Sequence, residues 1–123
     1  MAAGGWLDMA RSHKPVIWGL FAGGGTLAAF LVPVLMLITC FAIPLGLLPA
    51  DTLSYEHLSG LLRHPISKLV TFGVLFLVIW HAAHRMRITA HDLGSRNDTL
   101  VATICYGIAA AGTLLMLAAL IKI

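Results

Sequence analysis

The residue types that could carry out chemistry gather in one short stretch, HAAHRMRITAH, residues 81–91. It holds three histidines and two arginines and directly follows a long apolar run. Imidazoles can ligate a metal or haem and can relay protons, and guanidiniums offer fixed hydrogen-bond donors to a polar ligand. Cations and aromatic side chains also mark the edge of a membrane, where they meet the lipid headgroups. The cluster could therefore be a metal or haem site, a ligand site, or the boundary of a membrane segment.

A metal or haem site would need ligands from more than one segment. His81 and His84 are three residues apart on a predicted helix and so are neighbours on its surface. The other two long apolar runs contain no histidine, so this chain could give a haem at most one axial ligand, from this helix. Zinc would need more ligands converging on one point. We therefore expect neither a metal ligand nor a haem in this chain.

The membrane-boundary interpretation is favoured for the outer residues of the cluster. We expect Arg87, His91 and Arg96 to form an interfacial belt in which long cationic side chains reach the headgroups. For His84 and Arg85 the ligand site remains the stronger alternative, because aromatic residues of another segment are expected at the same depth.

Composition indicates a membrane protein. The chain has 123 residues, of which 59% are hydrophobic and 11% charged, against about 25% charged in an average soluble domain. The mean hydropathy is +0.93. The net charge of +3 does not indicate nucleic-acid binding, because the basic residues lie at the ends of apolar runs. No charged stretch is long enough to form a separate soluble domain.

Three apolar segments predict three transmembrane helices, at about residues 16–43, 65–91 and 99–121. The uncharged run from Val16 to Leu48 has 33 residues, which predicts one long helix that ends near Pro44. Between the first two segments, a short helix on the membrane surface is expected, capped by Ser54 or Asp51. The predicted fold is an all-α membrane protein, a single domain over residues 1–123 with three transmembrane helices and a short interfacial helix in the outer loop.

The distribution of Lys and Arg predicts the orientation. The N-terminal tail and the second loop hold five, and the opposite side holds three, so the N-terminus is expected in the cytoplasm. The start of the first helix and the end of the second then share the cytoplasmic edge. Trp18 and Phe21 should therefore approach His84 and Arg85.

These side chains suit a quinone at the membrane edge. The Trp18 indole and Arg85 could donate to the carbonyls, Phe21 could pack on the ring, and His84 could donate or relay a proton. Ala22 would leave room for the ring. No charge lies in the middle of any predicted span, which argues against an ion transporter.

Small residues on the first and third helices predict helix packing rather than chemistry, because they let backbones approach closely. On the first helix, Gly19 and Gly23 form a GxxxG motif that Gly24 and Gly25 extend. On the third helix, the expected packing residues are Gly107, Ala111 and Gly112.

Three stretches, KPVIWGLFAGGG, PLGLLPADTLSYEHL and HAAHRMRITAHDL, in this order and spacing, resemble the fumarate reductase D-subunit family. The resemblance covers about residues 13–123, and the third helix matches only as an apolar span. It implies a three-helix anchor in the bacterial cytoplasmic (inner) membrane that pairs with a second anchor, the C-subunit. It also implies that the pair holds a flavoprotein and an iron–sulfur subunit on the cytoplasmic face.

The resemblance further implies a non-catalytic subunit of quinol:fumarate reductase, acting in electron transport and anaerobic respiration. Menaquinol would be oxidised to menaquinone at the subunit interface, with FAD and iron–sulfur clusters only in partner subunits and no haem. The implied quinone-binding residues are Trp18, Phe21, Ala22, His84 and Arg85. One departure is Ala22, where a glycine is common in the family, and no role follows for the N-terminal MAAGGWLDMA.

Other functions stay open at this point. The same anchor architecture could serve a succinate dehydrogenase-type complex, or the chain could be a structural anchor with no quinone contact. A haem-carrying cytochrome subunit and a small transporter are more distant alternatives. No serine nucleophile motif, phosphate-binding loop or paired carboxylates within a span point to other chemistry.

Overall fold

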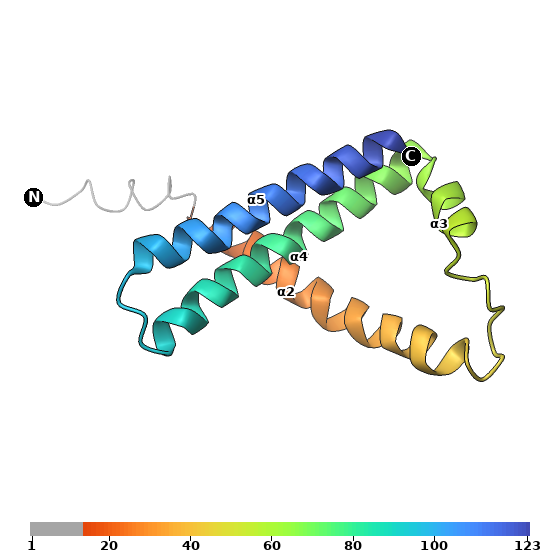
Figure 1. Cartoon of the computed structure of the whole chain (residues 1–123), viewed down its shortest axis with the longest axis horizontal. Helices are drawn as coiled ribbons and strands as arrows, with labels where there is room; N and C mark the ends of the chain where they lie inside the picture. The colour runs from red at the N-terminus through yellow and green to blue at the C-terminus, as the bar shows by residue number, and fades with distance from the viewer. Residues whose placement is uncertain (1–13) are drawn as a thin grey trace, which may run out of the picture.

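The computed structural model describes residues 14–123, which fold into helices joined by turns and loops (Figure 1). The N-terminal MAAGGWLDMA lies outside the described residues. In chain order the elements are α2 (Lys14–Leu37), the π-helix η1 (Ile38–Ala42), α3 (Tyr55–Leu62), α4 (Pro65–Asp92) and α5 (Asp98–Lys122).

Three of these segments are long and apolar enough to cross a bilayer: Lys14–Ala42, Pro65–Asp92 and Asp98–Lys122. With the short α3 between the first two, they confirm the predicted all-α membrane fold. The first span ends as a π-helix at Ala42, two residues before Pro44, as the sequence predicts.

The helix starts follow from local sequence. The Ser54 hydroxyl caps α3 by accepting from the His57 N–H at 3.3 Å, so Ser54 rather than Asp51 is the cap. The Asn97 side chain caps α5 by accepting from the Leu100 N–H at 3.0 Å. Pro65 occupies the first turn of α4, where its missing N–H costs no hydrogen bond.

A glycine ends α4 and lets the chain reverse. Gly94 has φ +94°, a left-handed conformation that glycine adopts without strain. The Gly94 N–H donates to the His91 carbonyl at 3.0 Å and the Ser95 N–H donates to the Ala90 carbonyl at 3.1 Å. After this short turn α5 runs back antiparallel along α4 (Figure 1). The two helices therefore form one hairpin.

The residues of α5 that pack on α4 are spaced alternately three and four positions apart along the helix. Ala109 is 2% exposed and Leu120 is also buried, while Tyr106 and Thr113 on the same face bond to α4. The predicted packing face of α5 is wrong as far as residues 14–123 are concerned. Gly107 has no heavy atom within 4 Å of an added Cβ, and neither does Gly112.

The first span crosses the hairpin rather than lying along it (Figure 1). At the crossing, a Cβ on Gly24 would lie 2.8 Å from the Leu77 carbonyl carbon, and one on Gly25 would lie 2.6 Å from the His81 ring. Gly19 and Gly23 have no such neighbour. Among residues 14–123, Gly19 and Gly23 of the GxxxG motif therefore make no close helix contact, because they lie on another face of the helix. The glycines that permit the close approach are Gly24 and Gly25.

Beyond the crossing, α2 diverges from α4 (Figure 1), and every residue from 29 to 37 is exposed. This half of the helix is entirely apolar. The close packing of α2 is thus confined to its first half, which places that half against the end of α4 that carries the histidines.

Candidate functional site

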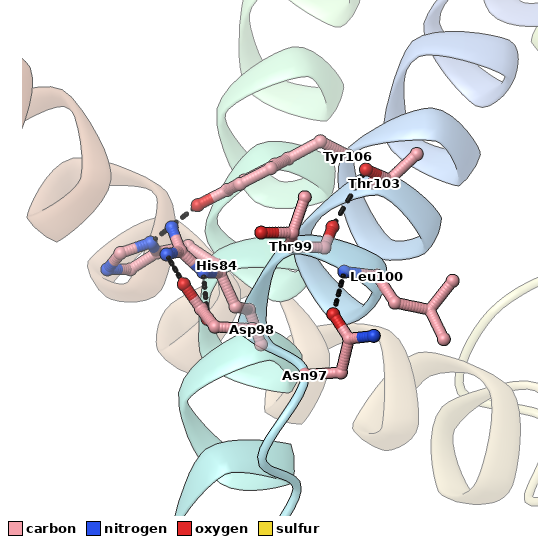
Figure 2. Close-up of polar contacts among 8 residues, drawn as sticks. His84, Asn97, Asp98, Thr99, Leu100, Thr103 and Tyr106 are labelled. Carbon is pink, nitrogen blue, oxygen red and sulfur yellow. Dashed lines mark hydrogen bonds and ion pairs between the residues drawn. The ribbon is translucent and has the colours of Figure 1, made fainter.

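Three side-chain contacts join α4 to α5 along one face. The Trp80 indole N–H donates to the Thr113 hydroxyl at 3.2 Å. His84 Nδ1 and the Tyr106 hydroxyl share a hydrogen bond of 2.9 Å. Figure 2 shows the side chains of His84 and Tyr106 turned toward each other between the two helices. The contacts hold the hairpin in register and leave His84 with one ring nitrogen engaged.

The third contact is an ion pair at the polar end of the hairpin. The Arg87 guanidinium donates to both Asp98 carboxylate oxygens, with Nε 2.9 Å from Oδ1. The same guanidinium lies 5.9 Å from the centre of the Tyr106 ring, within range of a cation–π attraction. Tyr106 also stacks near Trp80, with ring centroids 5.9 Å apart. Tyr106 is therefore held by three residues of α4.

The first span contributes an aromatic wall. The Phe21 ring lies 4.6 Å from the His84 ring, centroid to centroid. One turn along α4, His81 Nδ1 donates to the Phe21 carbonyl at 2.6 Å; a carbonyl only accepts, so this nitrogen carries the hydrogen. Gly25 leaves the space that the His81 ring fills. His81 thus fixes α2 against α4, and Phe21 is placed against His84.

An open groove of about 490 Å³ lies where α2 meets the end of α4. Its surface is mostly apolar, and it is lined by Lys14, Pro15, Ile17, Trp18, Phe21 and His84. Trp18 is 75% exposed, so its indole borders the groove without closing it. The His84 imidazole adds the polar group at the α4 side.

The structure brings together three of the five predicted quinone-binding residues. Trp18, Phe21 and His84 line the groove. Ala22 and Arg85 do not; each follows a lining residue by one position, about 100° further around its helix. Both are exposed, and Arg85 makes no hydrogen bond or ion pair within residues 14–123.

A second, polar pocket of about 390 Å³ lies toward the loop that joins α4 to α5. It is lined by His84, Arg87, Ile88, His91 and Asp98. His84 lines both this pocket and the apolar groove. The described part of the chain contains no group of three or more potential metal ligands.

Sequence reasoning missed two features of this site. It assigned Arg87 to the headgroup belt and gave it no partner, whereas Arg87 forms an ion pair with Asp98. It gave Tyr106 no role. A signal was available: the pairs Arg87–Asp98, His84–Tyr106 and Trp80–Thr113 are separated by 11, 22 and 33 residues. Such growing separations are expected when polar residues on one face of an antiparallel hairpin meet across it.

Comparison with known proteins identifies a family. The family described as the D-subunit of fumarate reductase matches residues 8–121. A fumarate reductase D-subunit of Photobacterium profundum is 43% identical over 103 residues, covering 84% of this chain and 86% of that protein. A second, from Vibrio parahaemolyticus, is 38% identical over 99 residues, covering 80% and 79%. A third, from Mycobacterium bovis, is 42% identical over 105 residues, covering 84% and 82%.

Proposed function

The chain belongs to the fumarate reductase D-subunit family, and from this premise we propose that it contributes one wall of a menaquinol site while anchoring the enzyme. It is a multi-pass membrane subunit by its three spans. The site lies at the cytoplasmic edge of the inner membrane, with the N-terminus in the cytoplasm. The observation that carries the proposal is the groove that Trp18, Phe21 and His84 share.

The lining of the groove suits a quinol. Such a molecule has a flat ring, two polar oxygens and an apolar tail, so it needs an apolar wall, a few polar groups and an opening to lipid. Phe21 and Ile17 supply the wall, and the exposed Trp18 indole can donate to an oxygen. The groove volume of about 490 Å³ falls in the range of small-molecule sites.

His84 supplies the polar group that can take a proton. Its Nδ1 is engaged with Tyr106, which leaves Nε2 for a ligand hydroxyl. When menaquinol is oxidised it must lose protons as well as electrons, and a positioned imidazole can accept one. Ala22 and Arg85 adjoin the groove on exposed faces, where the pocket is completed by a partner.

The exposed apolar surface suits an anchor that pairs with a second membrane protein. The diverging half of α2, from residue 29 to 37, is apolar and packs on nothing within the described chain. Lipid or an anchor of the C-subunit type covers it. The iron–sulfur subunit, with the flavoprotein attached to it, docks at the cytoplasmic edge and receives the electrons. FAD and the iron–sulfur clusters belong to those partners.

Replacing Trp18 by alanine tests the proposal. We expect the KM of the assembled complex for a short-chain menaquinol analogue to rise about tenfold, since a hydrogen-bond donor and part of the aromatic wall are lost. Turnover with reduced viologen, which delivers electrons directly to the soluble subunits, should be unchanged. The matched control is Phe30→Ala. Phe30 lies on the same helix and is 71% exposed, compared with 75% for Trp18, but it lies outside the groove.

A purely structural anchor would give a different result. Both variants would then assemble and keep the wild-type KM for the quinol analogue. Measuring fumarate reduction and succinate oxidation in the same preparation separates a fumarate reductase from a complex that works mainly in the succinate dehydrogenase direction.

A further inference from the structure

The position of His84 between two pockets has a consequence for the protons of the reaction. On one side lies the mostly apolar groove, and on the other lies the polar pocket lined by Arg87, Ile88, His91 and Asp98. The mostly apolar lining of the groove offers few hydrogen-bond acceptors to a released proton. The polar pocket, by contrast, adjoins the loop at the end of the hairpin and offers several hydrogen-bonding groups to water.

We propose that protons released from the quinol leave through His84 and Tyr106 into water in the polar pocket. The proposal rests on the proposed menaquinol site and adds Tyr106 as a proton relay and the polar pocket as the exit. It uses contacts already present in the chain, chiefly the 2.9 Å hydrogen bond between His84 Nδ1 and the Tyr106 hydroxyl.

The transfer balances in protons and electrons. Each quinol gives up two electrons and two protons, and the electrons pass to an iron–sulfur cluster of the partner subunit. Each proton bonds to His84 Nε2 as the Nδ1 proton moves to the Tyr106 oxygen. In the same step the Tyr106 hydroxyl proton passes to water in the polar pocket, so the oxygen never carries two protons. His84 then carries its ring hydrogen on Nε2, so its side chain must turn to bring that N–H toward Tyr106, and the Tyr106 hydroxyl must rotate, before a second proton is accepted.

The surroundings of Tyr106 favour this direction. Its ring lies near Trp80 and Arg87, and its hydroxyl bonds to His84. Arg87 and His84 both line the polar pocket. The volume of about 390 Å³ is large enough for roughly ten waters at about 30 Å³ each. Water there has polar partners, as an ordered water requires.

Titratable and charged groups near His84 come from each element packed on it. Lys14 of α2 lines the groove, Tyr106 and Asp98 come from α5, and Arg87 and His91 lie further along α4. Arg87 and Asp98 neutralise each other as an ion pair. The exit therefore contains neither a lone carboxylate that would trap a proton nor a lone guanidinium that would repel it.

The first test is Tyr106→Phe in the assembled complex. This change removes the hydroxyl and keeps the ring near Trp80 and Arg87. With a short-chain menaquinol analogue we expect kcat to fall by about tenfold or more, with KM within about twofold of wild type. The solvent deuterium isotope effect on kcat should increase, because proton transfer becomes rate-limiting. Added imidazole, which can carry protons, should restore part of kcat.

Thr113→Val is the matched control. It removes another hydroxyl that joins α5 to α4, the one that accepts from Trp80, at a distance from both pockets along the helices. It should leave kcat, KM and the isotope effect unchanged. Tyr106→Phe behaving like Thr113→Val would overturn the relay. So would a fall in kcat without a larger isotope effect or imidazole rescue, since that pattern indicates a structural role alone.

A second pair of variants tests the exit without touching the hydrogen bond. Ile88→Phe should fill part of the polar pocket and lower kcat several-fold, whereas Ile108→Phe, at an exposed isoleucine of α5 that lines neither pocket, should preserve kcat. Equal kcat in the two variants would refute the exit. If Trp18→Ala leaves KM unchanged, the menaquinol site itself is wrong; if only the Tyr106 and Ile88 variants fail to respond, the site stands and the proton route is wrong.

Discussion

Replacing Gly24 by alanine should separate α2 from α4 and reduce the amount of assembled complex, whereas Gly23→Ala should not. An added Cβ at Gly24 would clash with the Leu77 carbonyl group, 2.8 Å from its carbon, and would lie 2.7 Å from the His81 Cβ. The first is a backbone group, so a side-chain rotation cannot relieve the clash and the helices must move apart. Overpacking of this kind costs about 1–3 kcal/mol. The thermal midpoint of the solubilised complex and its yield on size-exclusion chromatography measure the effect.

Gly23 is a close control because it is the neighbouring glycine of the same helix and has no heavy atom within 4 Å of an added Cβ. Gly25→Ala should have an intermediate effect, because the atoms it meets belong to the His81 ring, which can turn away at the loss of its bond to the Phe21 carbonyl. Equal stability of the Gly23 and Gly24 variants would contradict the observed crossing of α2 over α4.

The helices could be predicted closely because their limits depend on local chemistry. The absence of charged residues determines where each span lies. N-cap residues such as Ser54 and Asn97 determine where helices begin, and Gly94 determines where α4 ends. Which face of a helix packs was harder to predict. Four glycines within seven residues of α2 satisfy a small-residue motif in more than one register, and only the direction in which α2 crosses α4 selects Gly24 and Gly25.

The candidate site was likewise predictable only in part from the sequence. Depth in the membrane was enough to predict that Trp18, Phe21 and His84 lie close together. The start of the first span and the end of the second lie at the same membrane edge. Tyr106 could not be predicted in this way, because depth does not say which side chain of α5 faces α4. Once the tight turn at Gly94 is known, the register of the hairpin follows, and it places Tyr106 opposite His84 and Asp98 opposite Arg87.

Replacing His84 by glutamine should abolish most quinol-dependent turnover while leaving quinol binding nearly intact. A glutamine amide can still bond to the Tyr106 hydroxyl and occupy the edge of the groove, but it cannot take up and release a proton. Loss of a general acid–base group typically costs about 10²–10⁴-fold in rate. We therefore expect kcat with a short-chain menaquinol analogue to fall by that order, with KM changed by no more than about threefold and viologen-driven fumarate reduction preserved.

His81→Gln is the matched control, because the same substitution is then made one turn earlier on α4. The His81 ring donates to the Phe21 carbonyl and lines neither the groove nor the polar pocket, and a glutamine amide can make the same donation. Its kcat should stay near that of wild type. A raised KM with unchanged kcat in His84→Gln would mean that His84 only binds the quinol. In that case the proton must leave through a partner protein, because within residues 14–123 only His84 joins the groove to the polar pocket.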